Sequence, residues 1–156
     1  MTLSGNQKRK MKSAARLYAV QALFQMEVSK QTVDQVRVEF LDFRFGAEVD
    51  ESADMIEGDT ALFNKTVEDA VNYQAPIDQM TDRALVAKWP INRIDPTLRA
   101  LFRAAGAEML KSDVPAKVAI SEYVTIAEAF FPDGKESKFV NAVLDHMARE
   151  AKPEAF

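Results

Sequence analysis

The chain has 156 residues, 47% of them hydrophobic, and carries 20 lysines and arginines against 24 aspartates and glutamates. A chain of this length can bury roughly 68–70% of its unfolded surface in one core, and the absence of cysteine excludes disulfides, thiolate metal sites and cysteine nucleophiles. The N-terminus is polar and basic and no long apolar run follows it, so we expect no signal peptide, no membrane span and a cytoplasmic protein.

The first element is distinguished by its charge. Before Glu27 there is no acid, and five residues are basic: Lys8, Arg9, Lys10, Lys12 and Arg16. The rest of the chain has 15 basic residues against 24 acidic ones, a net charge of −9. On a helix, all but Lys10 fall within an arc of about 100° and form a stripe. A confined basic stripe on an acidic body favours an anionic partner, because phosphates pair with lysine and arginine.

The start of the chain also fits a simpler interpretation. Residues 1–10 can be a flexible basic arm whose charges are merely solvated, because Ser4 and Gly5 favour disorder. The helical spacing of apolar residues predicts a first helix over 11–29. We therefore expect a basic arm over 1–10, one helical domain over 11–151 and a tail over 152–156.

The middle of the chain continues with helical periodicity. A second helix is predicted over 32–45, and the acidic, aperiodic residues 46–58 predict a loop. Asp59 can cap a third helix that Pro76 ends, and a fourth helix is predicted over 77–89.

The C-terminal half has clear start and stop signals. Asp95-Pro96 predicts a helix start, since the aspartate can accept hydrogen bonds from free amides and the proline needs no donor there. Val114-Pro115 begins another helix, which Pro132-Asp133-Gly134 ends, and a last helix is predicted over 136–150. The fold class is therefore all-α, a compact bundle of about six or seven helices, and the prolines also fit two helical subdomains that meet near Pro90.

Groups for catalysis are scarce. The only histidine, His146, is predicted on the surface of the last helix, and no cysteine or second histidine could complete a metal site with it. The five glycines are scattered singly, so no glycine-rich phosphate loop is present. We expect no catalytic residue, no metal site and no cofactor.

Four stretches, in this order and spacing, resemble the NusB family of transcription antitermination factors. They are residues 19–24 (Ala-Val-Gln-Ala-Leu-Phe), 93–103, 114–122 and 138–145 (Lys-Phe-Val-Asn-Ala-Val-Leu-Asp). The second stretch, which begins Arg-Ile-Asp-Pro, is close to the form of alphaproteobacterial members. The resemblance spans roughly residues 8–149.

This resemblance implies an all-helical protein without catalytic activity that binds single-stranded boxA-like RNA. In the family, the protein pairs with NusE, a ribosomal protein of the small subunit, and the complex helps RNA polymerase read through terminators in ribosomal RNA operons. Carried over by position, the RNA-contacting segment comprises Lys8, Arg9, Lys10, Lys12 and Arg16. A second RNA surface comprises Lys135, Lys138, Phe139 and Asn141. Phe24 and Leu98 would contact NusE.

Several alternatives stay open at this point. Phe139 lies on an apolar arc and could belong to the core, while Asn141 could read a base edge or cap the chain locally. The chain could also be a helical protein-interaction adaptor without RNA binding, or a stand-alone relative of the RNA-binding domain of RNA cytosine methyltransferases. Family members occur as monomers and as homodimers, so the resemblance leaves the oligomeric state undetermined.

Overall fold

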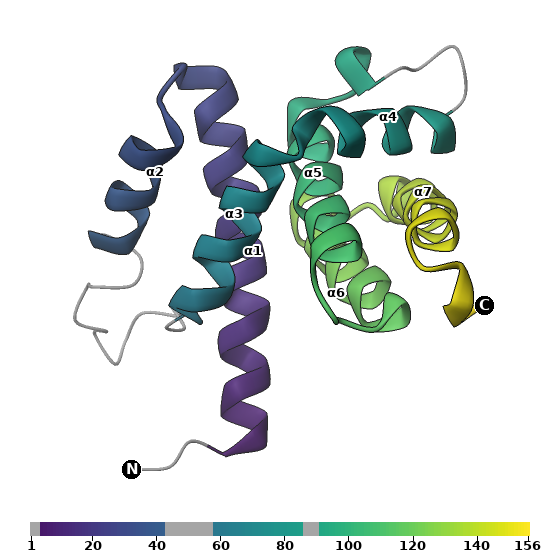
Figure 1. Cartoon of the computed structure of the whole chain (residues 1–156), viewed down its shortest axis with the longest axis horizontal. Helices are drawn as coiled ribbons and strands as arrows, with labels where there is room; N and C mark the ends of the chain where they lie inside the picture. Colours follow the sequence, from purple (N-terminus) through teal and green to yellow (C-terminus); the bar gives the residue numbers. More distant parts are fainter. Residues whose placement is uncertain (1–3, 43–57, 86–90) are drawn as a thin grey trace.

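The computed structural model describes residues 4–42, 58–85 and 91–156. Within these ranges the chain forms seven α-helices and no strand, which confirms the all-α prediction (Figure 1). The helices are α1 (Gly5–Ser29), α2 (Val33–Phe40), α3 (Thr60–Asn72), α4 (Gln74–Ala84), α5 (Pro96–Lys111), α6 (Ala116–Phe130) and α7 (Lys135–Ala151). Two short 3₁₀ helices, Ile91–Arg93 and Pro153–Ala155, precede α5 and follow α7. In the described residues, no helix is long and apolar enough to cross a membrane.

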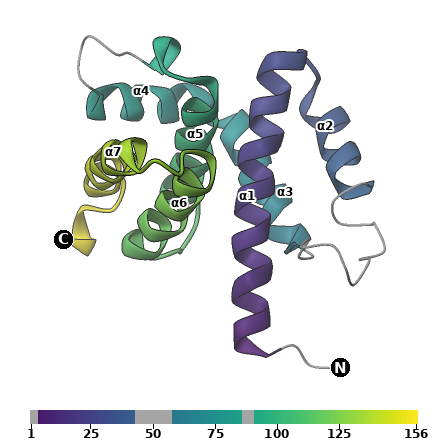
Figure 2. The ribbon, with the colours of Figure 1, turned by 180° about the vertical axis from the view of Figure 1, so that it is seen from behind.

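The helices form two groups around α5. Helices α1, α2 and α3 lie on one side, and α4, α6 and α7 pack on the other, as Figures 1 and 2 show. Because α5 contacts α1 and α3 as well as α4, α6 and α7, both groups share one hydrophobic core. The groups separate at Tyr73, between α3 and α4, and not at the predicted joint near Pro90, which lies outside the described residues.

Helix α1 begins six residues earlier than the sequence predicts. The Ser4 hydroxyl accepts a hydrogen bond from the Gln7 amide at 3.1 Å, and the Gln7 side chain accepts one from the Ser4 amide at 2.8 Å. This capping box satisfies two backbone donors that would otherwise lack partners at the helix start. The segment predicted as a flexible arm over 1–10 therefore has helical geometry from Gly5 onward.

Of the helix boundaries predicted at Asp59, Pro76 and Asp95, the structure confirms the two at the aspartates. Asp59 accepts from the Leu62 amide at 3.0 Å, and Asp95 accepts from the Thr97 amide at 2.7 Å, so both aspartates cap helices. Pro76 does not lie beyond the end of a helix. It occupies the third position of α4, where an amide has no intrahelical acceptor and a proline costs no hydrogen bond.

The predicted tail at the end of the chain is partly ordered, and the predicted loop over 46–58 lies almost wholly outside the described residues. The predicted tail over 152–156 contains the second 3₁₀ helix, and the Lys152 ammonium donates to the Ser112 carbonyl at 2.8 Å. The last three residues predicted for the second helix, and almost all of the predicted loop over 46–58, lie outside the described residues. His146 is exposed on α7, as predicted.

Gly106 allows α4 and α5 to approach closely. A Cβ atom built at this position would lie 2.5 Å from Cγ2 of Ile77 on α4, well inside van der Waals contact. We expect Gly106→Ala to have a free energy of unfolding about 1–3 kcal/mol below that of Gly5→Ala, because both variants gain the helix propensity of alanine and only Gly106→Ala is overpacked. Urea unfolding measures the effect. Gly5→Ala is the matched control, since nothing lies within 4 Å of its Cβ position, and equal stability of both variants would contradict the packing argument.

Candidate nucleic-acid interface

The N-terminal turns of α1 extend beyond the helical bundle (Figure 1). Lys8, Arg9, Lys10 and Lys12 are all exposed there, and none of them pairs with a carboxylate of the described residues. No acidic residue lies in the first turn, so the partial positive charge of the helix N-terminus adds to the four side chains. Within the described residues these four cations have no neutralising acid, and Lys8, in the first turn, also opposes the helix dipole, which costs stability unless an anion binds there. This end of an acidic protein is therefore suited to a polyanion.

Arg16 lies on the same arc but does not belong to this surface. Its side chain is only 4% exposed, and its Nε donates to both carboxylate oxygens of Glu108, at 2.8 and 3.1 Å. Its Nη1 also lies 3.4 Å from Glu122. The prediction that Arg16 extends the exposed stripe is wrong, because α1 is buried in the bundle from Ala14 to Arg16 and the Arg16 side chain reaches Glu108 on α5.

The buried charge on Arg16 is stabilised by its partners. Burial alone would lower the pKa of Arg16, but the hydrogen bond and negative charge of Glu108 outweigh this effect and raise it. Tyr123 of α6 is fully buried beside the pair. Burial raises the pKa of Tyr123 well above its ordinary value, and the Glu108 carboxylate raises it further. The cluster therefore combines a charged guanidinium, a carboxylate and a neutral phenol.

The raised pKa of Tyr123 makes stability depend on alkaline pH. In the unfolded chain the phenol loses its proton near pH 10.0, whereas in the folded chain it keeps the proton to higher pH. Folding is therefore progressively penalised above pH 10, by about 1.4 kcal/mol for each further pH unit. Since the unfolded phenol is only half ionised at pH 10, we expect the stability of the wild type relative to Tyr123→Phe to fall by about 1 kcal/mol between pH 10 and 11, measured by urea unfolding. A constant difference across this range would contradict the buried phenol's role.

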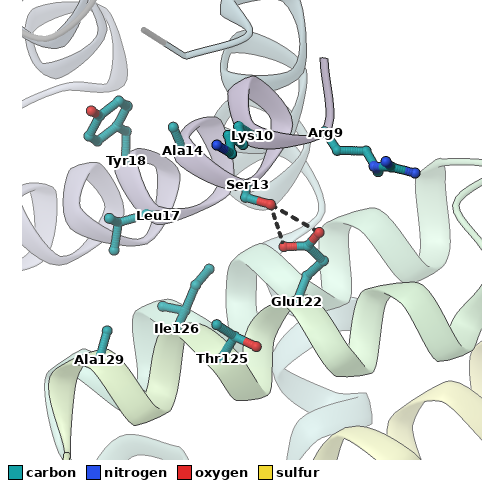
Figure 3. Close-up of a pocket in the computed structure, with 10 residues that line it drawn as sticks. All are labelled: Arg9, Lys10, Ser13, Ala14, Leu17, Tyr18, Glu122, Thr125, Ile126 and Ala129. Atoms are coloured by element: carbon teal, nitrogen blue, oxygen red, sulfur yellow. Dashed lines mark hydrogen bonds between the residues drawn. The ribbon is translucent and has the colours of Figure 1, made fainter. Parts of the chain in front are cut away.

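A groove of about 370 Å³ runs between α1 and α6 beside the exposed cations. Arg9 and Lys10 lie at one end, and Ser13 donates its hydroxyl proton to the Glu122 carboxylate, 2.9 and 3.1 Å from its two oxygens (Figure 3). The remaining lining residues are Ala14, Leu17, Tyr18, Thr125, Ile126 and Ala129. The groove thus joins a cationic entrance to a half-buried acceptor and an apolar wall.

The second predicted RNA surface lies on α7. Lys138 and Asn141 are exposed, and Asn141 is the seventh residue of the helix, so it does not cap it. Phe139 is half-buried, and its ring packs edge-on against Phe102 with centroids 6.2 Å apart, which favours the core interpretation. Lys135 begins α7, but its side chain is outside the described structure. Figures 1 and 2 show α7 across α6 from α1, so the two candidate surfaces lie on separate helices.

The two residues predicted to contact a protein partner differ in accessibility. Phe24 is half-buried and lines a groove of about 330 Å³ together with Thr97 and Phe130. Leu98 is 7% exposed and packs in the core with Leu101, so the prediction that it contacts a partner is wrong for this side chain. The helical spacing of the apolar residues on α5 already indicated this burial.

Two acids that the sequence prediction did not identify hold Arg16 and Ser13 in place. Glu108 and Glu122 pair with Arg16 and Ser13, yet neither glutamate was identified from the sequence. A signal was present for Glu108, which follows Ala105 by three residues and therefore lies on the apolar face of α5. An acid at such a position requires a buried cation as its partner.

The chain is similar in sequence to proteins of one family over almost its whole length. The model of the NusB family matches residues 13–149 of the chain. The transcription antitermination protein NusB of Maricaulis maris is 44% identical over 148 residues, covering 94% of this chain and 91% of that protein. The corresponding protein of Caulobacter vibrioides is 44% identical over 151 residues, covering 96% and 99%.

Two solved structures are similar in fold. The structure of NusB from T. maritima has a TM-score of 0.73 and 27% identity, covering 100% of this chain and 99% of that one. A structure of the antitermination factors NusB and NusE with double-stranded RNA has a TM-score of 0.71, covering 88% and 96%. At 22% identity, the second comparison shows likeness of fold alone.

Proposed function

Because the chain belongs to the NusB family, we propose that it is an RNA-binding transcription antitermination factor. The observation that supports this function most directly is the set of four exposed cations on the projecting start of α1, which pair with no carboxylate in the part of the chain that the structure describes. Phosphates of a nucleic acid would satisfy these cations and the helix N-terminus together. We propose that the protein acts by binding and without catalysis, in the cytoplasm.

The ligand we propose is a single-stranded boxA-like RNA. Lys8, Arg9, Lys10 and Lys12 would contact its phosphates, and Arg9 and Lys10 also line the groove beside α1. The acidic remainder of the chain would repel nucleic acid elsewhere, so the RNA would be directed to this end. Lys138 and Asn141 are both exposed on α7 and would contact a longer RNA, and Lys135 precedes them in sequence.

The protein partner we propose is NusE, in an assembly with elongating RNA polymerase on ribosomal RNA operons. The relative solved with NusE and RNA motivates this choice, and the groove beside Phe24 supplies a half-buried aromatic anchor of the kind that protein interfaces use. This groove lies along the C-terminal half of α1, away from the cations at its start. RNA and NusE could therefore occupy the protein together.

A titration with labelled RNA tests the proposal. The full chain is mixed with boxA RNA and with a scrambled RNA of equal length, with and without NusE, and binding is read by gel shift or fluorescence anisotropy. We expect preferential binding of boxA and stronger binding when NusE is present. Binding to NusE without retention of either RNA would show a protein-interaction adaptor and contradict the proposed function.

A further inference from the structure

The groove between α1 and α6 has the features of a base-reading site. On the basis of the proposed RNA binding, we infer that this groove receives one splayed base of the bound RNA and that Glu122 selects bases carrying an amino group. The groove opens beside the exposed cations, with Arg9 and Lys10 in its lining (Figure 3). A strand whose phosphates follow the start of α1 therefore has this groove within reach of its bases.

The Glu122 carboxylate is held in place and still has capacity to accept. It is 25% exposed, it accepts a hydrogen bond from the Ser13 hydroxyl, and one of its oxygens lies 3.4 Å from Nη1 of Arg16. A carboxylate has about four acceptor positions and donates nothing when ionised. With two partners assigned, acceptor positions remain for a ligand.

The chemistry of a fixed carboxylate discriminates among bases. Cytosine, adenine and guanine each present an exocyclic amino group that can donate to it, as glutamate does with the N4 amino group of cytosine. Uracil presents two carbonyl oxygens on either side of its single N–H, and these would face the carboxylate with like partial charge. Glu122 thus favours amino-bearing bases over uracil.

The rest of the groove suits the faces of a base. Leu17, Ile126 and Ala129 supply apolar wall, and the volume of about 370 Å³ lies in the range of sites that hold small molecules. The cations at the entrance are complementary to the phosphate attached to the same nucleotide. This combination of apolar wall, acceptor and adjacent cations favours a nucleotide over an apolar protein segment.

The test uses two short RNAs that differ only in the base edge. Fluorescein-labelled 12-nucleotide oligo(C) and oligo(U) are titrated with the full chain, and dissociation constants are measured by anisotropy. We expect oligo(C) to bind about tenfold more tightly, the effect of one hydrogen bond to a charged group. Glu122→Gln should remove this preference, because an amide offers both a donor and an acceptor while it preserves the bond from Ser13.

Two further variants separate base reading from phosphate binding. Lys12→Ala should weaken the binding of both RNAs equally and leave the preference for oligo(C) intact. Ala129→Trp should fill the groove and remove this preference, and the protein should stay folded because residue 129 is exposed. Equal binding of oligo(C) and oligo(U), or an unchanged ratio in Glu122→Gln, would overturn the base-reading site while the proposed function stands. If boxA RNA also fails to bind, the proposed function itself fails.

Discussion

Reversing the charges of Lys8 and Lys12 should abolish high-affinity RNA binding while the protein stays folded. Both side chains are exposed, lie four residues apart on α1 and pair with no carboxylate of the described structure. In Lys8→Glu/Lys12→Glu, two attractive contacts with phosphates become repulsive ones. We expect the dissociation constant at physiological salt to rise about 100-fold, measured by fluorescence anisotropy.

The matched control changes the same net charge at a distant surface. Arg83 and Arg149 are exposed cations on α4 and α7, so Arg83→Glu/Arg149→Glu alters the total charge as much as the α1 variant does. We expect the control to bind RNA within a few-fold of wild type, because charges farther apart than the Debye length of about 8 Å are largely screened. Equal losses in both variants would mean that net charge, and not the start of α1, governs binding.

Removing the buried charge on Arg16 should strongly destabilise the fold. Arg16 and Glu108 are 4% and 2% exposed, so Arg16→Met leaves a carboxylate in the core without its guanidinium. We expect the free energy of unfolding to fall by about 3–5 kcal/mol, measured by urea unfolding. Exchanging Arg16 for glutamate would place two acids together and destabilise the protein still more, so such a variant cannot test RNA contact.

A double substitution separates the ion pair from general damage to the core. Arg16→Met/Glu108→Leu removes both buried charges, and it should recover most of the stability lost by either single change, because apolar residues of similar volume can replace a buried pair. Additive losses in the double variant would show that the side chains act through packing and not through their charges.

The fold could be predicted where the signal lies within one helix. The capping aspartates, the all-helical class and the stop at Pro132-Asp133-Gly134 depend on local hydrogen bonding and backbone geometry, and the structure confirms them. The predicted start of α1 is too late, because Ser4 and Gly5 favour a disordered terminus by composition, whereas Ser4 and Gln7 form a capping box. Pro76 also fits the end of a helix, but proline is equally tolerated in a first turn.

The site could be predicted only in part, because burial depends on contacts distant in sequence. Periodicity placed Arg16 on the same arc as Lys8 and Lys12, but it could not show that α5 covers this arc after three turns. The bond from Ser13 to Glu122 joins residues 109 positions apart, and no local pattern indicates it. The sequence therefore identified the cations, whereas the groove and its acceptor required the fold.

The salt dependence of RNA binding tests the central claim most directly. If the start of α1 holds phosphates through its cations, the logarithm of the binding constant should fall linearly with the logarithm of salt concentration, with a slope of about −0.7 for each phosphate contacted on a single strand. For Lys8, Arg9, Lys10 and Lys12, the predicted slope is about −3 in the wild type, and Lys8→Ala/Lys12→Ala should reduce its magnitude by roughly half. A slope near zero, or the same slope in both proteins, would contradict the assignment of RNA binding to this surface.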